Sequence, residues 1–267
     1  MSSQSKTAQQ PVSGKNADKV FKGVAYACGI LILVVLAAVA LFLLFRAWPL
    51  IGGDQQANSD TISNFTGGKA SSFWGYVGPL LFGTVLISAL ALLISFFVSV
   101  GIALFISHYA PKKLATALSY VVDLLAAIPS VIYGLLGILI LNPLMYKMEL
   151  AVFKGSSTHQ YTGGANLISA VLVLALMILP TVINISESAL RAVPGHLKSA
   201  SLALGATKIQ TIFQVILPAA KSGIITAVVL GTGRAIGEAM AITLVSGSSV
   251  NFPLPFNSVR FLTTAIV

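Results

Sequence analysis

The segment Ser222–Val250 reads SGIITAVVLGTGRAIGEAMAITLVSGSSV, and its only charged residues are Arg234 and Glu238. It is long enough to cross a bilayer, which takes about 20 mainly apolar residues. A guanidinium at the centre of a span costs roughly 2.5–3.5 kcal/mol on insertion scales, and such groups usually face a bundle interior or a water-filled path. This segment therefore predicts a membrane protein that carries an ion. Because arginine is always protonated and its donors fit oxyanions, we expect an anion.

The composition of the whole chain agrees with a membrane protein. The 267 residues are 56% hydrophobic and 9% charged, whereas a soluble domain carries about 25% charged residues. The net charge of +9 does not indicate nucleic acid binding, because the basic residues lie at the ends of apolar runs. With one cysteine and no cysteine–histidine spacing, the chain predicts neither an intrachain disulfide nor a metal site. We expect contact with membrane lipid and no nucleic acid partner.

Apolar segments predict an all-α, polytopic bundle of transmembrane helices. Five spans are expected, at Gly23–Phe45, Leu80–Ile106, Leu118–Leu144, Leu167–Ser186 and Ser222–Gly247. Residues 70–111 contain no Asp, Glu, Lys or Arg and are long enough for two helices. The glycines and proline at 75–79 favour a single helix that starts near residue 80. Residues 46–79 are then an extracytoplasmic connection.

The distribution of Lys and Arg predicts the orientation. With one helix at 80–106 and the N-terminus in the cytoplasm, basic residues are more numerous inside than outside, as the positive-inside rule requires. The inside group is Lys6, Lys15, Lys19, Lys22, Lys112, Lys113, Arg191, Lys198, Lys208 and Lys221, and the outside group is Arg46, Lys69, Lys147, Lys154 and Arg260. We expect a multi-pass membrane protein with residues 1–22 as a flexible cytoplasmic tail.

Five spans leave the C-terminus outside the cell. The chain ends at Ala265–Ile266–Val267, within a new apolar run. We expect a sixth span beyond this point, so that residues 80–267 form an incomplete bundle core.

Helix breakers recur at membrane depth. Pro129 is expected to interrupt the third span and Pro180 the fourth. Each is either a packing kink or a kink that lines a path, since neighbouring helices can satisfy the freed carbonyl. Gly233 and Gly237 form a small-xxx-small pair that permits close helix contact.

Arg234 and Glu238 are four residues apart, so one helix face can carry both and allow an ion pair. One interpretation is a structural pair that neutralises itself inside the bundle. The other is that Arg234 offers its donors to an oxyanion, while Glu238 holds the guanidinium and keeps the empty site neutral. Asp123 in the third span is either a second carboxylate of this path or an interfacial residue. No catalytic residue is predicted.

The connection Ser188–Lys221 carries the most specific pattern of the chain. Residues 193–208 read VPGHLKSASLALGATK and residues 209–220 read IQTIFQVILPAA. The pattern predicts a short amphipathic helix, a glycine at which it ends, and a second short helix closed by Leu-Pro. Such an elbow can pack into a groove on a partner.

This connection resembles the EAA motif of ABC importer permeases, E-A-A-x3-G-x9-I-x-L-P, whose elbow docks on an ATPase subunit. Val215 stands for the isoleucine, while Ser199 replaces the glutamate and Ser201 the second alanine. The substitution of Ser199 removes the motif's acid but leaves the helix–glycine–helix pattern. The resemblance implies ATPase coupling by Ala200, Ser201, Gly205, Ala206, Thr207, Lys208, Leu217 and Pro218.

Two further strings narrow the resemblance. Residues 125–135, LAAIPSVIYGL, and 234–241, RAIGEAMA, are similar to permeases of phosphate-specific ABC importers. The extra N-terminal span and residues 78–84 resemble the C-type subunit. This implies a type I ABC importer fold and import of inorganic phosphate by alternating access. It also implies a heterodimer with a second permease subunit, two ATP-binding subunits and an extracytoplasmic phosphate-binding protein.

No cofactor is predicted for this chain itself. It has no G-x-x-x-x-G-K-[ST] phosphate loop, so ATP and magnesium are expected on the partner subunits. Two alternatives stay open. One is an ATPase-independent channel or secondary transporter for an anion, and the other is a permease of the same superfamily for sulfate, molybdate or another solute.

Overall fold

The computed structural model of the chain is a bundle of α-helices. It describes residues 15–52, 55–66, 68, 70, 72–154, 160–247, 249 and 254–263. These residues contain no β-strand, and four of their helices are long and apolar enough to cross a membrane, or five if the bent run 208–237 is one span. The predicted all-α, polytopic class is confirmed. The apolar end at 265–267, on which the expected sixth span depends, lies outside the described residues.

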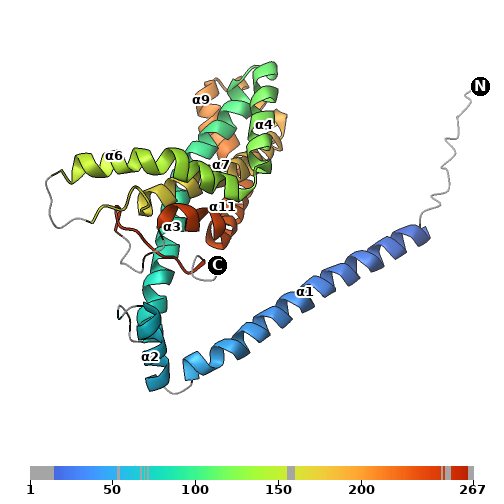
Figure 1. The fold of residues 1–267 in the computed structure, drawn as a ribbon. Helices are drawn as coiled ribbons and strands as arrows, with labels where there is room; N and C mark the ends of the chain where they lie inside the picture. The colour runs from blue at the N-terminus through green and yellow to red at the C-terminus, as the bar shows by residue number, and fades with distance from the viewer. Residues whose placement is uncertain are drawn as a thin grey trace, which may run out of the picture.

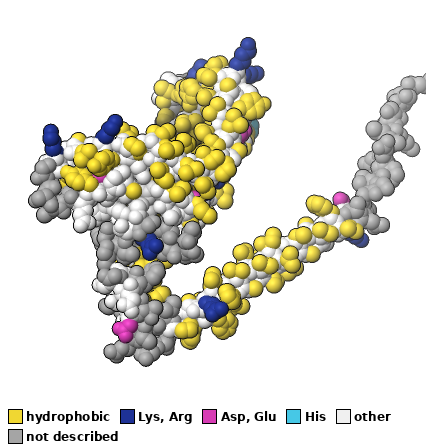
Figure 2. Space-filling view, viewed as in Figure 1, with side chains coloured by type: hydrophobic (Ala, Val, Ile, Leu, Met, Phe, Trp, Pro, Cys, Tyr) yellow, Lys and Arg dark blue, Asp and Glu magenta, His cyan; other side chains and the backbone are white. Residues whose placement is uncertain are grey.

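The first helix stands apart from the bundle (Figure 1). α1 (Lys15–Gly52) is joined to it through α2 (Gln55–Thr66). The large apolar side chains of α1 are exposed, and Figure 2 shows charged side chains only near its two ends. A helix that is apolar all round has its surface available for lipid or another subunit. Residues 15–22 of the predicted tail belong to this helix, whereas residues 1–14 lie outside the described part.

The second apolar stretch forms one long helix, as the charge distribution predicted. α3 (Phe73–Leu104) continues through a π-helical turn, η1 (Phe105–Tyr109). The helix starts earlier than predicted because Ser72 accepts a hydrogen bond from the Gly75 amide at 3.1 Å and caps the first turn. Pro79 therefore lies inside α3 and does not mark its start.

The predicted third span, 118–144, is wrong as a single helix. The chain forms α4 (Lys112–Ala127), breaks at residues 128–129, and then forms a second continuous run over 130–152. Ile128 is extended, with ψ of 128°, because a following proline excludes the α region for the residue before it. The interruption expected at Pro129 is confirmed. Figure 1 shows that α4 and the end of the second run point in different directions.

The second run begins with two short elements and ends in a longer helix. These are α5 (Ser130–Leu136), η2 (Gly137–Leu141) and α6 (Asn142–Val152). Glu149 of α6 is fully buried, and its Oε1 accepts a hydrogen bond from the Thr162 amide at 2.9 Å. This buried carboxylate thus fastens the connection between α6 and the next helix.

α7 (Leu167–Arg191) is the central helix and packs against α3 along much of its length. The buried face of α3 includes the small residues Ala91, Ser95 and Ser99. Small residues allow helix backbones to approach closely in a membrane, and the Ser99 hydroxyl donates to the Leu179 carbonyl oxygen at 3.3 Å. Pro180 is buried and α7 continues through it, so the span is not divided there, while a kink at Pro180 stays a prediction. The packed neighbours hold the helix across the missing N–H.

The predicted fifth span, 222–247, is also divided. α11 (Lys221–Gly237) ends one residue before Glu238, whose backbone is extended, and α12 (Met240–Ser246) follows. A Cβ added at Gly233 or at Gly237 would meet nothing within 4 Å beyond its own helix. Within the described residues, this pair therefore makes no close helix contact.

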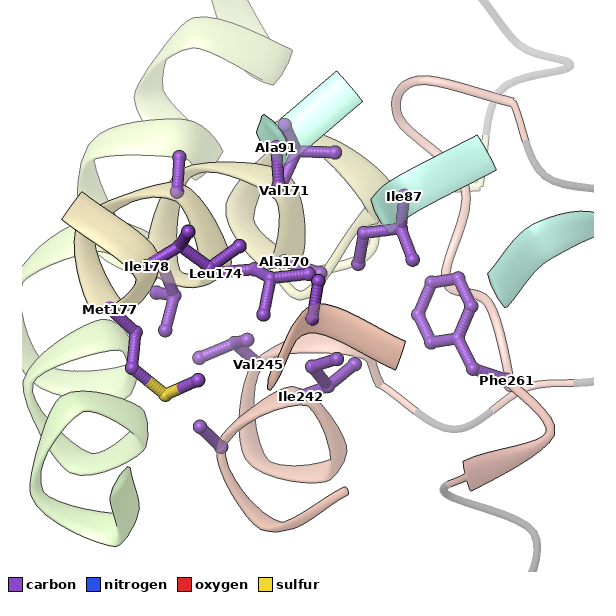
Figure 3. Close-up of a cluster of buried hydrophobic side chains, with 14 of the residues drawn as sticks. Ile87, Ala91, Ala170, Val171, Leu174, Met177, Ile178, Ile242, Val245 and Phe261 are labelled. Atoms are coloured by element: carbon purple, nitrogen blue, oxygen red, sulfur yellow. The ribbon is translucent and has the colours of Figure 1, made fainter. Parts of the chain in front are cut away.

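The main hydrophobic core lies where α3, α7 and α12 meet (Figure 3). Its labelled side chains are Ile87, Ala91, Ala170, Val171, Leu174, Met177, Ile178, Ile242, Val245 and Phe261. Phe261 comes from the last described segment, 254–263, and is fully buried. The Leu262 amide donates to Thr84 Oγ1 of α3 at 3.0 Å. The end of the described chain thus closes this side of the core.

Replacing Gly137 with valine is expected to destabilise the bundle. A Cβ at this position would collide with Val245 of α12 and lie 2.9 Å from the Val173 side chain, and overpacking a core costs roughly 1–3 kcal/mol. We expect a lower thermal unfolding midpoint for the purified variant in detergent. Gly29→Val in α1 is the matched control, because a Cβ there meets nothing within 4 Å. If both variants lower the thermal unfolding midpoint equally, the result would contradict the packing of η2 on α12.

Candidate functional site

Arg234 lies near the end of α11 and is half-buried. Its Nε is buried and has no hydrogen-bond partner among the described residues. The positive charge of Arg234 interacts electrostatically with Tyr133 of α5. The Tyr133 hydroxyl donates a hydrogen bond to the Leu125 carbonyl oxygen at 2.8 Å. A buried donor left without a partner costs about 1–3 kcal/mol. Arg234 therefore has an unused donor for a ligand or another subunit.

The two helices that follow the chain breaks pack side by side. A Cβ at Gly134 would lie 3.0 Å from the Ala241 Cα, and one at Gly137 would meet Val245. Residue numbers rise together along α5 and α12, so both helices start at the same end of the pair. The free N–H groups at a helix start carry partial positive charge. The strings 125–135 and 234–241 therefore meet at a junction of two broken helices, which we call the junction.

Glu238 does not pair with Arg234. The helix ends at Gly237, so the two residues do not share a continuous helical face. Glu238 Oε1 instead accepts a hydrogen bond from the Ala241 amide at 3.0 Å and caps the start of α12. The expected ion pair is absent among the described contacts, because the Glu238 carboxylate bonds to the first turn of α12. The Arg234 guanidinium therefore receives no hydrogen bond or ion pair from Glu238.

Asp123 lies on α4, before the break at 128–129, and is exposed. Its Oδ1 accepts a hydrogen bond from Asn184 Nδ2 of α7 at 2.9 Å. The described residues show no hydrogen bond or ion pair between Asp123 and Arg234. The structure brings Tyr133 within electrostatic range of Arg234.

The predicted helix–glycine–helix elbow is present. α8 (Gly195–Ala203) is followed by Gly205, with φ of +86°, and by α9 (Lys208–Thr211). This φ lies in the left-handed region, which glycine adopts without steric cost. Thr207 starts α9 with a capping box: its Oγ1 accepts from the Gln210 amide at 3.3 Å, and Gln210 Oε1 accepts from the Thr207 amide at 2.8 Å. Both features fix the angle of the elbow.

The residues that the motif resemblance assigns to coupling lie along this elbow. Ala200 and Ser201 are on α8, Ala206 lies in the turn, and Lys208 begins α9. The second helix continues through η3 (Ile212–Ile216) and α10 (Leu217–Ala219) and ends one residue after Pro218, as the Leu-Pro pattern predicted. The run 208–219 then bends by 65° into α11. The elbow is thus connected directly to the helix that carries Arg234.

The elbow presents large apolar side chains to its surroundings. No residue of α8 is buried, and the exposed fraction is 91% for Leu204, 60% for Ile209 and 58% for Phe213. In Figure 1, α9 and the start of α4 lie at one end of the bundle, and the start of α3 at the other. Exposed apolar side chains that cluster in this way mark an interaction surface.

Sequence reasoning did not single out Tyr133 as a site residue. It lies within the string 125–135, but a continuous third span gave no reason to place it near Arg234. The available signal was Pro129, because a helix that restarts at Ser130 puts residue 133 in its first turn. The buried Glu149 was also missed, since it follows the predicted end of the third span.

Comparison with known proteins agrees with this geometry. Residues 99–264 match the family described as binding-protein-dependent transport system inner membrane component. The phosphate transport system permease protein PstC 2 of Mycobacterium tuberculosis is 36% identical over 88% of this chain and 75% of its own length. The probable ABC transporter permease protein YqgH of Bacillus subtilis is 35% identical over 90% and 75%. The phosphate transport system permease protein PstC of Haemophilus influenzae is 32% identical over 88% and 76%.

The match spans more than half of the chain and includes the elbow and both strings of the junction. Together with the apolar helices, it makes this chain a multi-pass membrane protein. The chain belongs to the family of binding-protein-dependent transport system inner membrane components.

Proposed function

We propose that this chain is the permease subunit of an ATP-driven importer of inorganic phosphate. The observation that carries the proposal is Arg234, whose buried Nε at the junction has no hydrogen-bond partner in the described part of the chain. A planar guanidinium fits phosphate oxyanions through paired hydrogen bonds. The names of the relatives in Mycobacterium tuberculosis and Haemophilus influenzae, both phosphate transport system permeases, support phosphate as the solute.

The connection from the elbow to Arg234 supports a mechanism of alternating access. A partner ATPase that moves the elbow moves the run 208–219, and the 65° bend passes this displacement to α11. α11 carries Arg234, whereas Tyr133 belongs to α5, on the other side of the junction. A shift of α11 therefore changes the separation between the two side chains. Glu238 stays bound to the start of α12, so the chain break at 238–239 can absorb the movement.

The proposed assembly contains a second permease subunit, two ATP-binding subunits and an extracytoplasmic phosphate-binding protein. ATP and magnesium bind the ATP-binding subunits. The exposed apolar surface of the elbow supports the ATPase contact, and the uncovered glycines at 233 and 237 support a contact with another membrane helix. In this assembly the elbow and the N-terminus face the cytoplasm of a bacterial cell, as the distribution of basic residues predicts.

Uptake by the reconstituted importer tests the proposal. The complete complex in proteoliposomes, supplied with the binding protein, is expected to accumulate labelled phosphate only when ATP is present on the cytoplasmic side. Uptake of labelled sulfate under the same conditions is the control for solute specificity. Uptake without ATP would favour a channel or secondary transporter, and preference for sulfate would favour the other superfamily alternative. Either result would contradict the proposed function.

A further inference from the structure

A small hollow lies at the base of the elbow, formed by elements other than those of the junction. Its volume is about 150 Å³, and its walls come from η1, α8, α9 and η3. Ile212 and Ile216, both almost fully buried, form its apolar side. One water takes about 30 Å³ in the liquid. The hollow therefore has room for a small tetrahedral anion and some water.

The polar side of the hollow is positively charged. Lys198 of α8, Lys208 of α9 and His108 of η1 line it, and the charges of Lys198 and Arg191 both act on the His108 ring. No acidic residue lines it, and within the described part of the chain neither lysine forms an ion pair. Glu187, on the neighbouring α7, is already bound by Arg191 Nε at 2.8 Å.

Hydrogen-bond donors are present beside these charges. Thr211, which is 1% exposed, lines the hollow and shares a hydrogen bond of 3.0 Å with Ser201. The Ser107 hydroxyl donates to the Ala103 carbonyl oxygen at 2.7 Å and also lies 2.7 Å from His108 Nδ1. His108 Nδ1 is therefore engaged by Ser107, and the charged donors that line the hollow are the two lysines.

We propose that this hollow binds a phosphate-type oxyanion, either free inorganic phosphate or the phosphodiester of an anionic lipid headgroup. Lysine ammonium groups bind phosphate as point charges, and the two lysines approach from the two helices of the elbow, α8 and α9. A bound anion therefore links these two helices to each other. The inference does not depend on which solute the permease carries.

Hydrogen–deuterium exchange of the complete importer complex in nanodiscs tests this site. In phosphatidylcholine nanodiscs, inorganic phosphate at ten times its dissociation constant is expected to slow exchange of the amides of residues 198–211 about tenfold. In nanodiscs that contain phosphatidylglycerol, a lipid headgroup in the hollow gives the same slowing without added phosphate. The variant K198Q/K208Q is expected to lose the response. Lys113→Gln on α4, a cytoplasmic lysine outside the hollow, should keep it.

Two outcomes would overturn the proposal. One is that neither inorganic phosphate nor phosphatidylglycerol slows exchange, or that K198Q/K208Q responds as the control does. The other is that K198Q/K208Q releases the ATPase subunits while the exchange response is kept, which would assign both lysines to ATPase docking. Arg234→Ala should retain the response at residues 198–211. Loss of phosphate uptake in that variant, with the response retained, separates this site from the proposed transport path.

Discussion

Arg234→Ala is expected to reduce ATP-driven phosphate uptake at least about 100-fold. Removal of one preorganised donor to a developing or bound oxyanion costs about 10²–10³ in rate, and alanine removes every donor of the guanidinium. The buried Nε has no partner among the described residues, so the substitution breaks no described hydrogen bond within the chain. The fold should therefore persist. The measurement is initial uptake of labelled phosphate by proteoliposomes, with ATPase retention followed by co-purification.

Two further arginine variants make this test specific. Arg46→Ala removes an exposed arginine at the far end of α1 and should leave uptake unchanged. Arg234→Lys keeps the charge but loses the planar fork of donors, so we expect partial uptake with a weaker apparent affinity for phosphate. Normal uptake by Arg234→Ala would refute the role assigned to this residue. Loss of the ATPase subunits from that variant would instead indicate a role in assembly.

Leu204→Asp combined with Ile209→Asp is expected to detach the ATPase subunits. These side chains are 91% and 60% exposed, so the free permease loses little packing when they change. Burial of a leucine or isoleucine at an interface contributes about 1.5–3 kcal/mol each, and every 1.4 kcal/mol is tenfold in affinity. The double variant should therefore weaken ATPase binding by at least about 100-fold. Co-purification and stimulated ATP hydrolysis measure the loss.

A control at a distant position separates docking from general surface charge. Val152→Asp combined with Leu150→Asp places the same two charges on exposed side chains at the end of α6, outside the elbow. It should leave ATPase binding intact. If the elbow variant retains its ATPase subunits, the contact uses other residues, and the assignment of the elbow to coupling is wrong.

Local sequence signals were sufficient to predict the elbow. Gly205 marks the end of one helix, and the spacing from Thr207 to Gln210 forms a capping box that needs only neighbouring residues. α7 starts at Leu167, as the apolar segment predicted, and Asn166 caps that start by accepting a hydrogen bond from the Ser169 amide at 3.0 Å. Such capping signals act over three or four residues, so a short segment of sequence is enough to predict where a helix begins or ends.

The breaks in the spans were harder to predict, because hydropathy reports apolar length and not direction. Residues 118–144 and 222–247 are apolar throughout most of their length, yet each is divided between two helices. Pro129 marked the first break, but the second has no proline. The packing of α12 against α5 and α7 accompanies the break at Glu238, and that packing joins segments that are distant in the chain.

The sequence by itself determined that this chain is a helical membrane protein, that it contains the elbow, and that an arginine lies within an apolar segment. Apolar length, the positive-inside bias and the spacing around Gly205 are properties of single segments. Only the tertiary structure decided what surrounds the arginine. Glu238 bonds to the start of α12 instead of Arg234, and Tyr133 comes within range of its charge, because two separate chain breaks are packed together. Side-chain partners across such a junction depend on long-range packing, which no local pattern encodes.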